Sequence, residues 1–132
     1  MEKTLSIVKP DGVKRGLIGE ILKRYEKKNL QIINLKMVVA DKEILEKHYE
    51  EHKEKSFFCD LIKYMCSGEI VLIEIQGENV VEIVRKINGE TNPLKAEMGT
   101  IRGDFSNSVT ENIVHGSDSV ENAKQEIALW FK

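Results

Sequence analysis

The spacing of apolar residues along the chain predicts alternating strands and helices. Apolar residues at every second position indicate strands at residues 5–8 and 33–39, and an almost unbroken apolar run indicates a central strand at 70–75. Apolar residues three and four apart indicate helices over 17–25, 43–50, 57–65, 80–87 and 119–131. In the second strand we expect one buried face, made by Ile33, Leu35, Met37 and Val39.

Segments without periodicity separate these elements. Residues 9–12 (KPDG) have the composition of a turn, and residues 90–110 are expected to form a long ordered loop, which is usually functional in a compact domain. Asp118 and Glu121 have the spacing of a capping box, so the last helix is expected to begin near Ser119.

The order of the elements matches β-α-β-β-α-β, with extra helices and a long loop before the last strand. We therefore expect an α+β, ferredoxin-like fold, in which a four-stranded antiparallel sheet is covered by helices. The sequence contains no repeat, linker or change of composition that would mark a boundary, so residues 1–132 are expected to form a single domain.

Composition narrows the class of protein. With 41% hydrophobic and 32% charged residues the chain is typical of a soluble globular protein, and no apolar run is long enough to span a membrane. The formal net charge of -2 gives no basic excess for general nucleic-acid binding. Cys59 and Cys66 lie seven residues apart on a predicted helix, too far to pair, and two free thiols without a leader predict a cytoplasmic protein.

His115 is the first candidate for chemistry. It ends a short β-branched run and precedes Gly116 and a helix N-terminus, where free N–H groups and the helix dipole favour an anion such as phosphate. Glu126, two turns into that helix, is placed to hold one ring nitrogen and leave the other free to attack. By local pattern alone a purely structural histidine is the more common case.

Four other side chains have open interpretations. His48 and His52 are one helical turn apart, a spacing that can bind a metal, but without a third ligand nearby a solvated surface is favoured. Tyr49 and Phe57 are expected to pack in the core by default, with a base-stacking surface as the alternative.

Five separated blocks carry a resemblance to a known family. They are residues 9–13 (KPDGV), 15–20 (RGLIGE), 89–93 (GETNP), 99–105 (GTIRGDF) and 112–119 (NIVHGSDS). In this order they strongly resemble nucleoside diphosphate kinase, and the resemblance runs from Thr4 to Phe131.

The resemblance implies an Mg²⁺-dependent enzyme that transfers the γ-phosphate of a nucleoside triphosphate such as ATP to a diphosphate such as GDP, through a phosphohistidine. It implies broad base and sugar tolerance and a role in maintaining nucleoside triphosphate pools. His115 resembles the nucleophile, Glu126 and Ser117 the groups that hold the imidazole, and Lys9 and Tyr49 the side chains facing the phosphate. The implied nucleotide contacts are Lys9, Phe57, Arg85, Thr91, Arg102 and Asn112.

The resemblance further implies that Mg²⁺ arrives on the nucleotide phosphates and needs no protein side chain as ligand. It implies a homo-oligomer, a tetramer or hexamer, with no need of a membrane or nucleic acid. Met98 and Ser56 stand where many family members have proline, and the chain ends early at Lys132, which leaves the choice of oligomer open.

Two alternatives to a kinase are a non-catalytic, nucleotide-binding regulatory module and a protein-to-protein phosphohistidine relay. Ferredoxin-like domains often serve as binding modules. The joint presence of His115, Lys9, Arg85 and Arg102 favours catalysis, because a binding module would not need a nucleophile among three cations.

Overall fold

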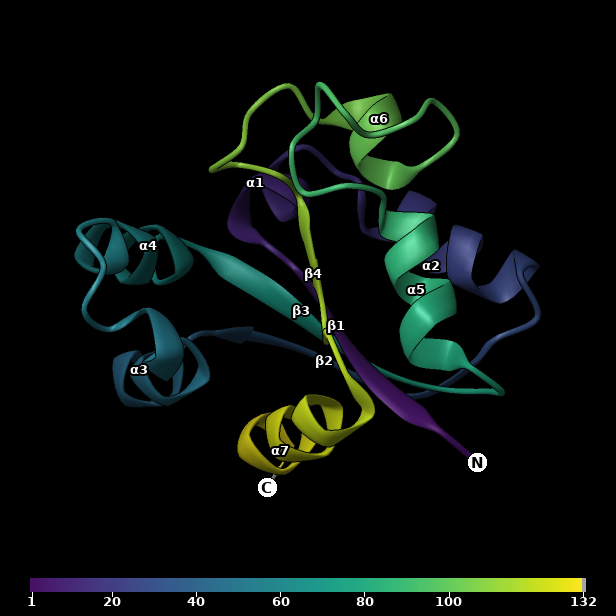
Figure 1. The fold of residues 1–132 in the computed structure, drawn as a ribbon, viewed down its shortest axis with the longest axis horizontal. Coiled ribbons are helices and arrows are strands. Elements are labelled where there is room, and N and C mark those ends of the chain that lie inside the picture. The colour runs from purple at the N-terminus through teal and green to yellow at the C-terminus, as the bar shows by residue number, and fades with distance from the viewer. Residues whose placement is uncertain (132) are drawn as a thin grey trace.

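A four-stranded antiparallel sheet forms the centre of the molecule (Figure 1). The computed structural model describes residues 1–131, so Lys132, the last residue of the expected domain, lies outside the described residues. The strands are β1 (Lys3–Val8), β2 (Gln31–Val39), β3 (Glu69–Gln76) and β4 (Val114–Gly116), in the spatial order β2-β3-β1-β4. This is the predicted ferredoxin-like arrangement, and that prediction is confirmed.

Helices cover both faces of the sheet. They are α1 (Pro10–Lys14), α2 (Ile18–Lys27), α3 (Lys42–His48), η1 (Glu50–His52), α4 (Phe58–Met65), α5 (Val80–Asn88), α6 (Ile101–Phe105) and α7 (Val120–Trp130). In Figure 1, α2 and α5 lie together on one side of the sheet, and α3 and α4 lie on the other. The helix α7 packs on the same face of the sheet as α3 and α4.

Alternation along the two central strands produces two cores. In β1, Leu5 and Ile7 pack with Leu45 of α3 and Trp130 of α7, whereas Val8 packs with α2 and α5 on the opposite face. Because both faces are covered, β1 and β3 consist almost entirely of buried residues.

The predicted buried face of β2 is wrong in this chain. Leu35, Met37 and Val39 are 54%, 49% and 64% exposed. The register shifts between Ile32 and Asn34, and β2 lies at the edge of the sheet, next to β3. The alternation of apolar and polar residues alone could not distinguish a strand with a buried apolar face from an edge strand with exposed apolar side chains.

Three local predictions also need correction. Residues 9–12 are not a simple turn, because Pro10 begins the short helix α1, with its ring at the first helical position. The 90–110 loop contains the short helix α6, capped by Thr100. The helix α7 begins at Val120 as expected within a residue, but Ser119 caps it and Asp118 does not.

None of the helices in residues 1–131 combines the length and the apolar character needed to cross a bilayer.

Candidate active site

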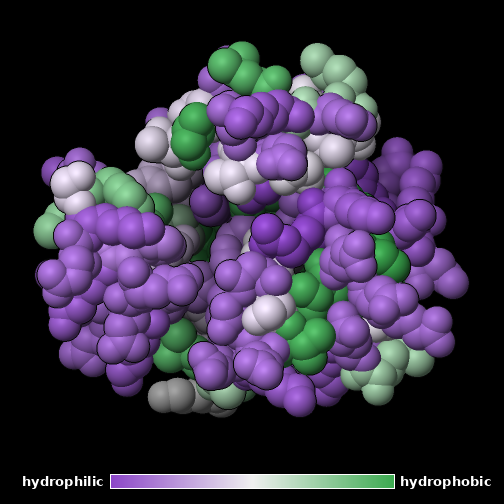
Figure 2. Space-filling model, viewed as in Figure 1, coloured by the Kyte–Doolittle hydropathy of each residue, from purple (hydrophilic) through white to green (hydrophobic). Residues whose placement is uncertain are grey.

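A cavity of about 1170 Å³ opens between the helices α3 and α5 and the N-terminal end of α7. Figure 2 shows the surface hollowed on this side of the molecule. The wall contains eight of the ten predicted site residues: Lys9, Tyr49, Arg85, Thr91, Arg102, Asn112, His115 and Glu126. The other two, Ser117 and Phe57, do not line it.

The position of His115 follows from strand pairing. His115 lies opposite Ile7 across the β1–β4 pair, so both side chains point to the face that α3 and α7 cover. Directly before His115 in the chain, the Val114 N–H donates to the carbonyl of Asn112 at 2.8 Å, and Ile113 between them has a φ of 76°. This is a γ-turn with positive φ at a β-branched residue, a strained conformation that its surroundings must hold.

Asp11 holds the strained turn in place. Its carboxylate accepts a hydrogen bond from the Ile113 N–H at 3.1 Å and another from the Tyr64 hydroxyl of α4. Lys9 N–H also donates to the Ile113 carbonyl at 2.8 Å. The turn therefore fixes Asn112 and His115 relative to the end of β1.

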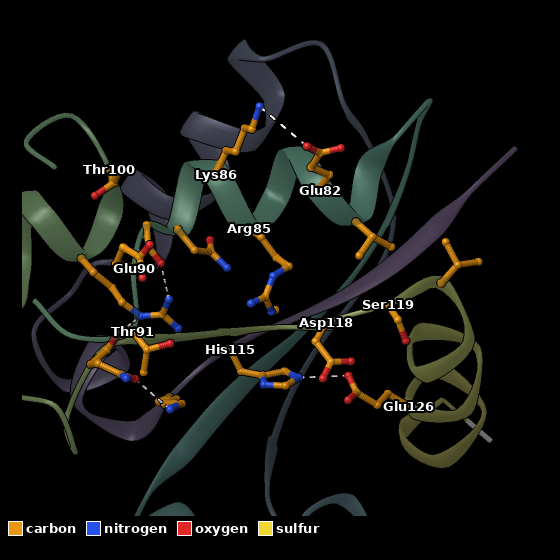
Figure 3. A pocket seen from close by; sticks show the side chains of 18 of the residues that line it. Glu82, Arg85, Lys86, Glu90, Thr91, Thr100, His115, Asp118, Ser119 and Glu126 are labelled. Atoms are coloured by element: carbon orange, nitrogen blue, oxygen red, sulfur yellow. Dashed lines mark hydrogen bonds and ion pairs between the residues drawn. The ribbon is translucent and has the colours of Figure 1, made fainter. Parts of the chain in front are cut away.

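His115 and Glu126 point toward each other from β4 and α7 (Figure 3). His115 Nε2 lies 2.9 Å from Glu126 Oε1, and Ser117 Oγ donates to the same oxygen at 2.7 Å. A carboxylate accepts hydrogen bonds, so Nε2 carries the ring proton and Nδ1 keeps a free lone pair. Burial opposes ionisation of Glu126, but the hydrogen bond and charge of His115 hold its pKa below the usual range.

Lys9 and Arg102 bring positive charge to the cavity wall. Burial, with the nearby charge of Arg102, lowers the pKa of Lys9 to about 8, and its ammonium donates to Asn112 Oδ1 at 2.8 Å. Burial lowers the pKa of Arg102 as well. Its guanidinium donates to the carbonyls of Asn112, Gly89 and Val114 at 3.3, 2.7 and 2.5 Å, which ties α6 to the segments on either side of the site.

Arg85 differs from the two buried cations. It is exposed on α5 and extends into the cavity above His115, as Figure 3 shows. Thr91, also exposed, lies on the loop that follows α5 and presents its side chain to the same space.

The two aromatic candidates have different surroundings. Tyr49 packs in the core, as the default expectation had it, and also lines the cavity. Its buried hydroxyl has no hydrogen-bond partner among residues 1–131. Burial raises the pKa of that hydroxyl. Phe57 is 47% exposed, beside His52 with ring centres 5.7 Å apart, and is not part of the core.

His48 lines the cavity and Trp130 contacts it from α7, and neither was predicted to be at the site. The ring centre of His48 lies 4.7 Å from that of His115, and Trp130 Nε1–H donates to His48 Nδ1 at 3.0 Å. The expectation of a solvated surface is wrong for His48, which is half-buried against His115. Among the described residues, His48, His115 and Glu126 form a group whose potential ligand atoms lie within 4.8 Å of one another. No pattern in the sequence predicts the contact between His48 and Trp130, which are 82 positions apart.

The arrangement is suited to moving a phosphoryl group. A histidine with one ring nitrogen fixed and the other free lies among cations from three distant parts of the chain. Phosphoryl transfer needs mainly such positioning and cationic stabilisation. The fold and the site together indicate a phosphotransferase.

Comparisons with known proteins identify the family. The family model described as nucleoside diphosphate kinase matches residues 2–132. A nucleoside diphosphate kinase of Caldanaerobacter subterraneus subsp. tengcongensis is 64% identical over 99% of this chain and 94% of its own length. One from Acaryochloris marina is 54% identical over 100% of this chain and 89% of its own.

Solved structures agree with this assignment. The crystal structure of a nucleoside diphosphate kinase family protein from Babesia bovis matches with a TM-score of 0.98 and 46% identity, covering 100% of this chain and 89% of that one. The chain belongs to the nucleoside diphosphate kinase family. It is a phosphotransferase that acts on nucleotides.

Proposed function

We propose that this chain passes the γ-phosphate of a nucleoside triphosphate to a nucleoside diphosphate through a phosphohistidine at Nδ1 of His115. One observation carries the proposal. Glu126 accepts a hydrogen bond from the Nε2–H of His115, so the lone pair that can attack phosphorus is on Nδ1.

The first half-reaction balances on these groups. The Nδ1 lone pair forms a bond to the γ-phosphorus, and the bond from that phosphorus to the bridging oxygen breaks, leaving its electrons on the departing diphosphate. The ring then carries positive charge, with its proton still on Nε2, and the Glu126 carboxylate stabilises that charge. The second half-reaction is the reverse, with a different diphosphate as acceptor.

Cations and polar groups at the wall would bind the phosphates. Lys9 and Arg85 offer charge, and Arg102 retains two of its five N–H groups after bonding three carbonyls. Thr91, Asn112 and the Tyr49 hydroxyl add neutral donors. The free hydroxyl of Tyr49 supports this role, because a buried polar group without a partner is costly unless a ligand satisfies it.

We assign the base contact to Phe57. Its exposed ring is available for stacking, and stacking on one aromatic face does not read base edges. Broad tolerance of bases would follow.

Mg²⁺ would enter with the nucleotide. Mg²⁺ prefers oxygen ligands and usually keeps several water ligands, so phosphate oxygens and water can fill most of its coordination sphere without protein side chains. Asp118, an exposed carboxylate on the cavity wall, would accept hydrogen bonds from that water. The ion's chemistry would be to neutralise charge on the phosphate oxygens.

We further propose a homo-oligomer, a tetramer or hexamer. The exposed apolar side chains of Leu35, Met37 and Val39 on the edge strand β2 support this, because an open apolar edge otherwise favours aggregation.

The match of one family model to residues 2–132 supports the proposal that the chain forms a single domain. The free thiols of Cys59 and Cys66 support a cytoplasmic location.

Initial-rate kinetics test the function. With ATP and GDP as substrates, a phosphoenzyme route gives parallel double-reciprocal lines, whereas direct transfer gives intersecting lines. His115→Ala should abolish exchange while circular dichroism stays unchanged. Full exchange by that variant would refute the role of His115.

A further inference from the structure

His48 has a fixed tautomer beside the candidate nucleophile. At the end of α3, its Nδ1 accepts the Trp130 indole N–H at 3.0 Å. A neutral imidazole has one lone pair and one N–H, so this hydrogen bond places the proton on Nε2. Trp130 is itself buried at the end of α7, so the contact joins two helices across the site.

The other side of His48 faces the cavity. Its ring meets that of His115 edge-on, with centres 4.7 Å apart and planes at 72°. His48 lines the cavity, and Nε2 has no hydrogen-bond partner among residues 1–131. The result is an N–H donor, held by a second helix, within reach of the space next to His115.

His48 is a neutral donor under ordinary conditions. Burial, with the adjacent charge of His115, lowers the pKa of His48 to about 3. A neutral N–H can bond a phosphate oxygen without repelling the positive charge that develops on His115.

The same hydrogen bonds argue against a metal site at this group. His48, His115 and Glu126 have suitable spacing for three ligands. However, the lone pair of His48 already accepts from Trp130, and the Nε2 proton of His115 binds Glu126. A metal would need both hydrogen bonds to break.

We propose that His48 is a further catalytic residue, whose Nε2–H donates a hydrogen bond to a non-bridging oxygen of the phosphoryl group as it moves to and from His115. Trp130 is the positioning residue that fixes the tautomer. This inference rests on the proposed function, because it assumes that His115 accepts the phosphoryl group.

A set of three variants separates catalysis from packing. His48→Phe keeps a ring of similar size without the N–H, His48→Gln restores an N–H donor near the position of Nε2, and Trp130→Phe keeps a ring but no longer fixes the tautomer. The measurement is the single-turnover rate of protein phosphorylation at saturating labelled ATP, with ATP affinity measured separately.

Loss of a hydrogen bond to a charged phosphate should slow phosphorylation by about 10- to 100-fold in His48→Phe, with ATP affinity changed by less than about twofold. His48→Gln should recover most of the rate, and Trp130→Phe should fall between them. Equal slowing by the Phe and Gln variants would show a packing role and overturn the proposal, as would a wild-type rate in His48→Phe.

Nitrogen-15 NMR of the wild type gives a readout that packing does not move. His48 should show an unprotonated Nδ1 and a protonated Nε2 that do not titrate between about pH 5 and pH 8. The opposite tautomer, or titration in this range, would overturn the proposal. If the wild type is not phosphorylated by ATP at all, the proposed function itself fails, which is a distinct outcome from an active enzyme indifferent to His48.

Discussion

Replacing Glu126 by Gln tests the hydrogen bond that selects the attacking nitrogen. The two side chains have nearly the same shape, so the amide oxygen can still accept from His115 Nε2 and from Ser117. The lost feature is the negative charge 2.9 Å from the ring that becomes cationic on phosphorylation. Glu126→Gln should therefore lower the rate of phosphorylation without unfolding the protein.

The expected size comes from the difference between charged and neutral hydrogen bonds. A charge-assisted hydrogen bond is about twice as strong as a neutral one, which here amounts to about 1.4 kcal/mol or a tenfold lower rate. The side chain of Glu126 is 15% exposed, so solvent screens the charge only in part. A larger loss would indicate that the amide turns its NH₂ group to the ring and reverses the tautomer.

Rapid-quench measurement of phosphoenzyme formation from ATP is the assay. Glu121→Gln is the matched control, because Glu121 is an exposed carboxylate on the first turn of the same helix. The control should keep the wild-type rate. If both variants are equally slowed, or if neither is, the reasoning about the Glu126 charge is refuted.

Three further predictions concern other parts of the site. Because the pKa of Lys9 is lowered to about 8, its charge is present below that pH and lost above it, so kcat/KM should fall as pH rises through about 8; a flat profile to about pH 10 would contradict this. Phe57→Ala should raise KM by similar factors for all nucleotides, through loss of stacking worth about 1–3 kcal/mol per base, and a loss confined to one base would count against stacking. Arg102→Lys should lower the free energy of unfolding in urea by about 2 kcal/mol, because one ammonium cannot reach three carbonyls, whereas Arg85→Lys on exposed α5 should leave it unchanged; equal values for the two variants would refute the structural role of Arg102.

Local periodicity predicted the elements that the central sheet depends on. The strand at 70–75 and the helix at 80–87 lie within β3 and α5, because their apolar residues bury against neighbours on the expected faces. It failed for β2, where Leu35 and Met37 alternate as a buried face would but lie on an exposed edge. Exposure there depends on how far other helices reach, which the strand's own sequence does not encode.

Site residues were predictable when a motif or a short-range contact carried them. His115 and Glu126 lie 11 positions apart, on a strand and on the helix that directly follows it, so their contact could be predicted from these two elements alone. His48 and Trp130 meet only because α3 and α7 pack on the same face of the sheet. That contact depends on the whole fold. The local sequence suggested His48 only as a disfavoured metal ligand and did not single out Trp130.

The most direct test of the account is the chemical identity of the phosphorylated atom. The protein would be incubated with γ-labelled ATP and magnesium, the label characterised for acid lability and isomer, and the phosphoenzyme then chased with GDP. The geometry predicts an acid-labile phosphate on Nδ1 of His115, absent from His115→Ala, that passes to GTP. A label on another residue or on Nε2, or GTP formation without any phosphoenzyme, would contradict it.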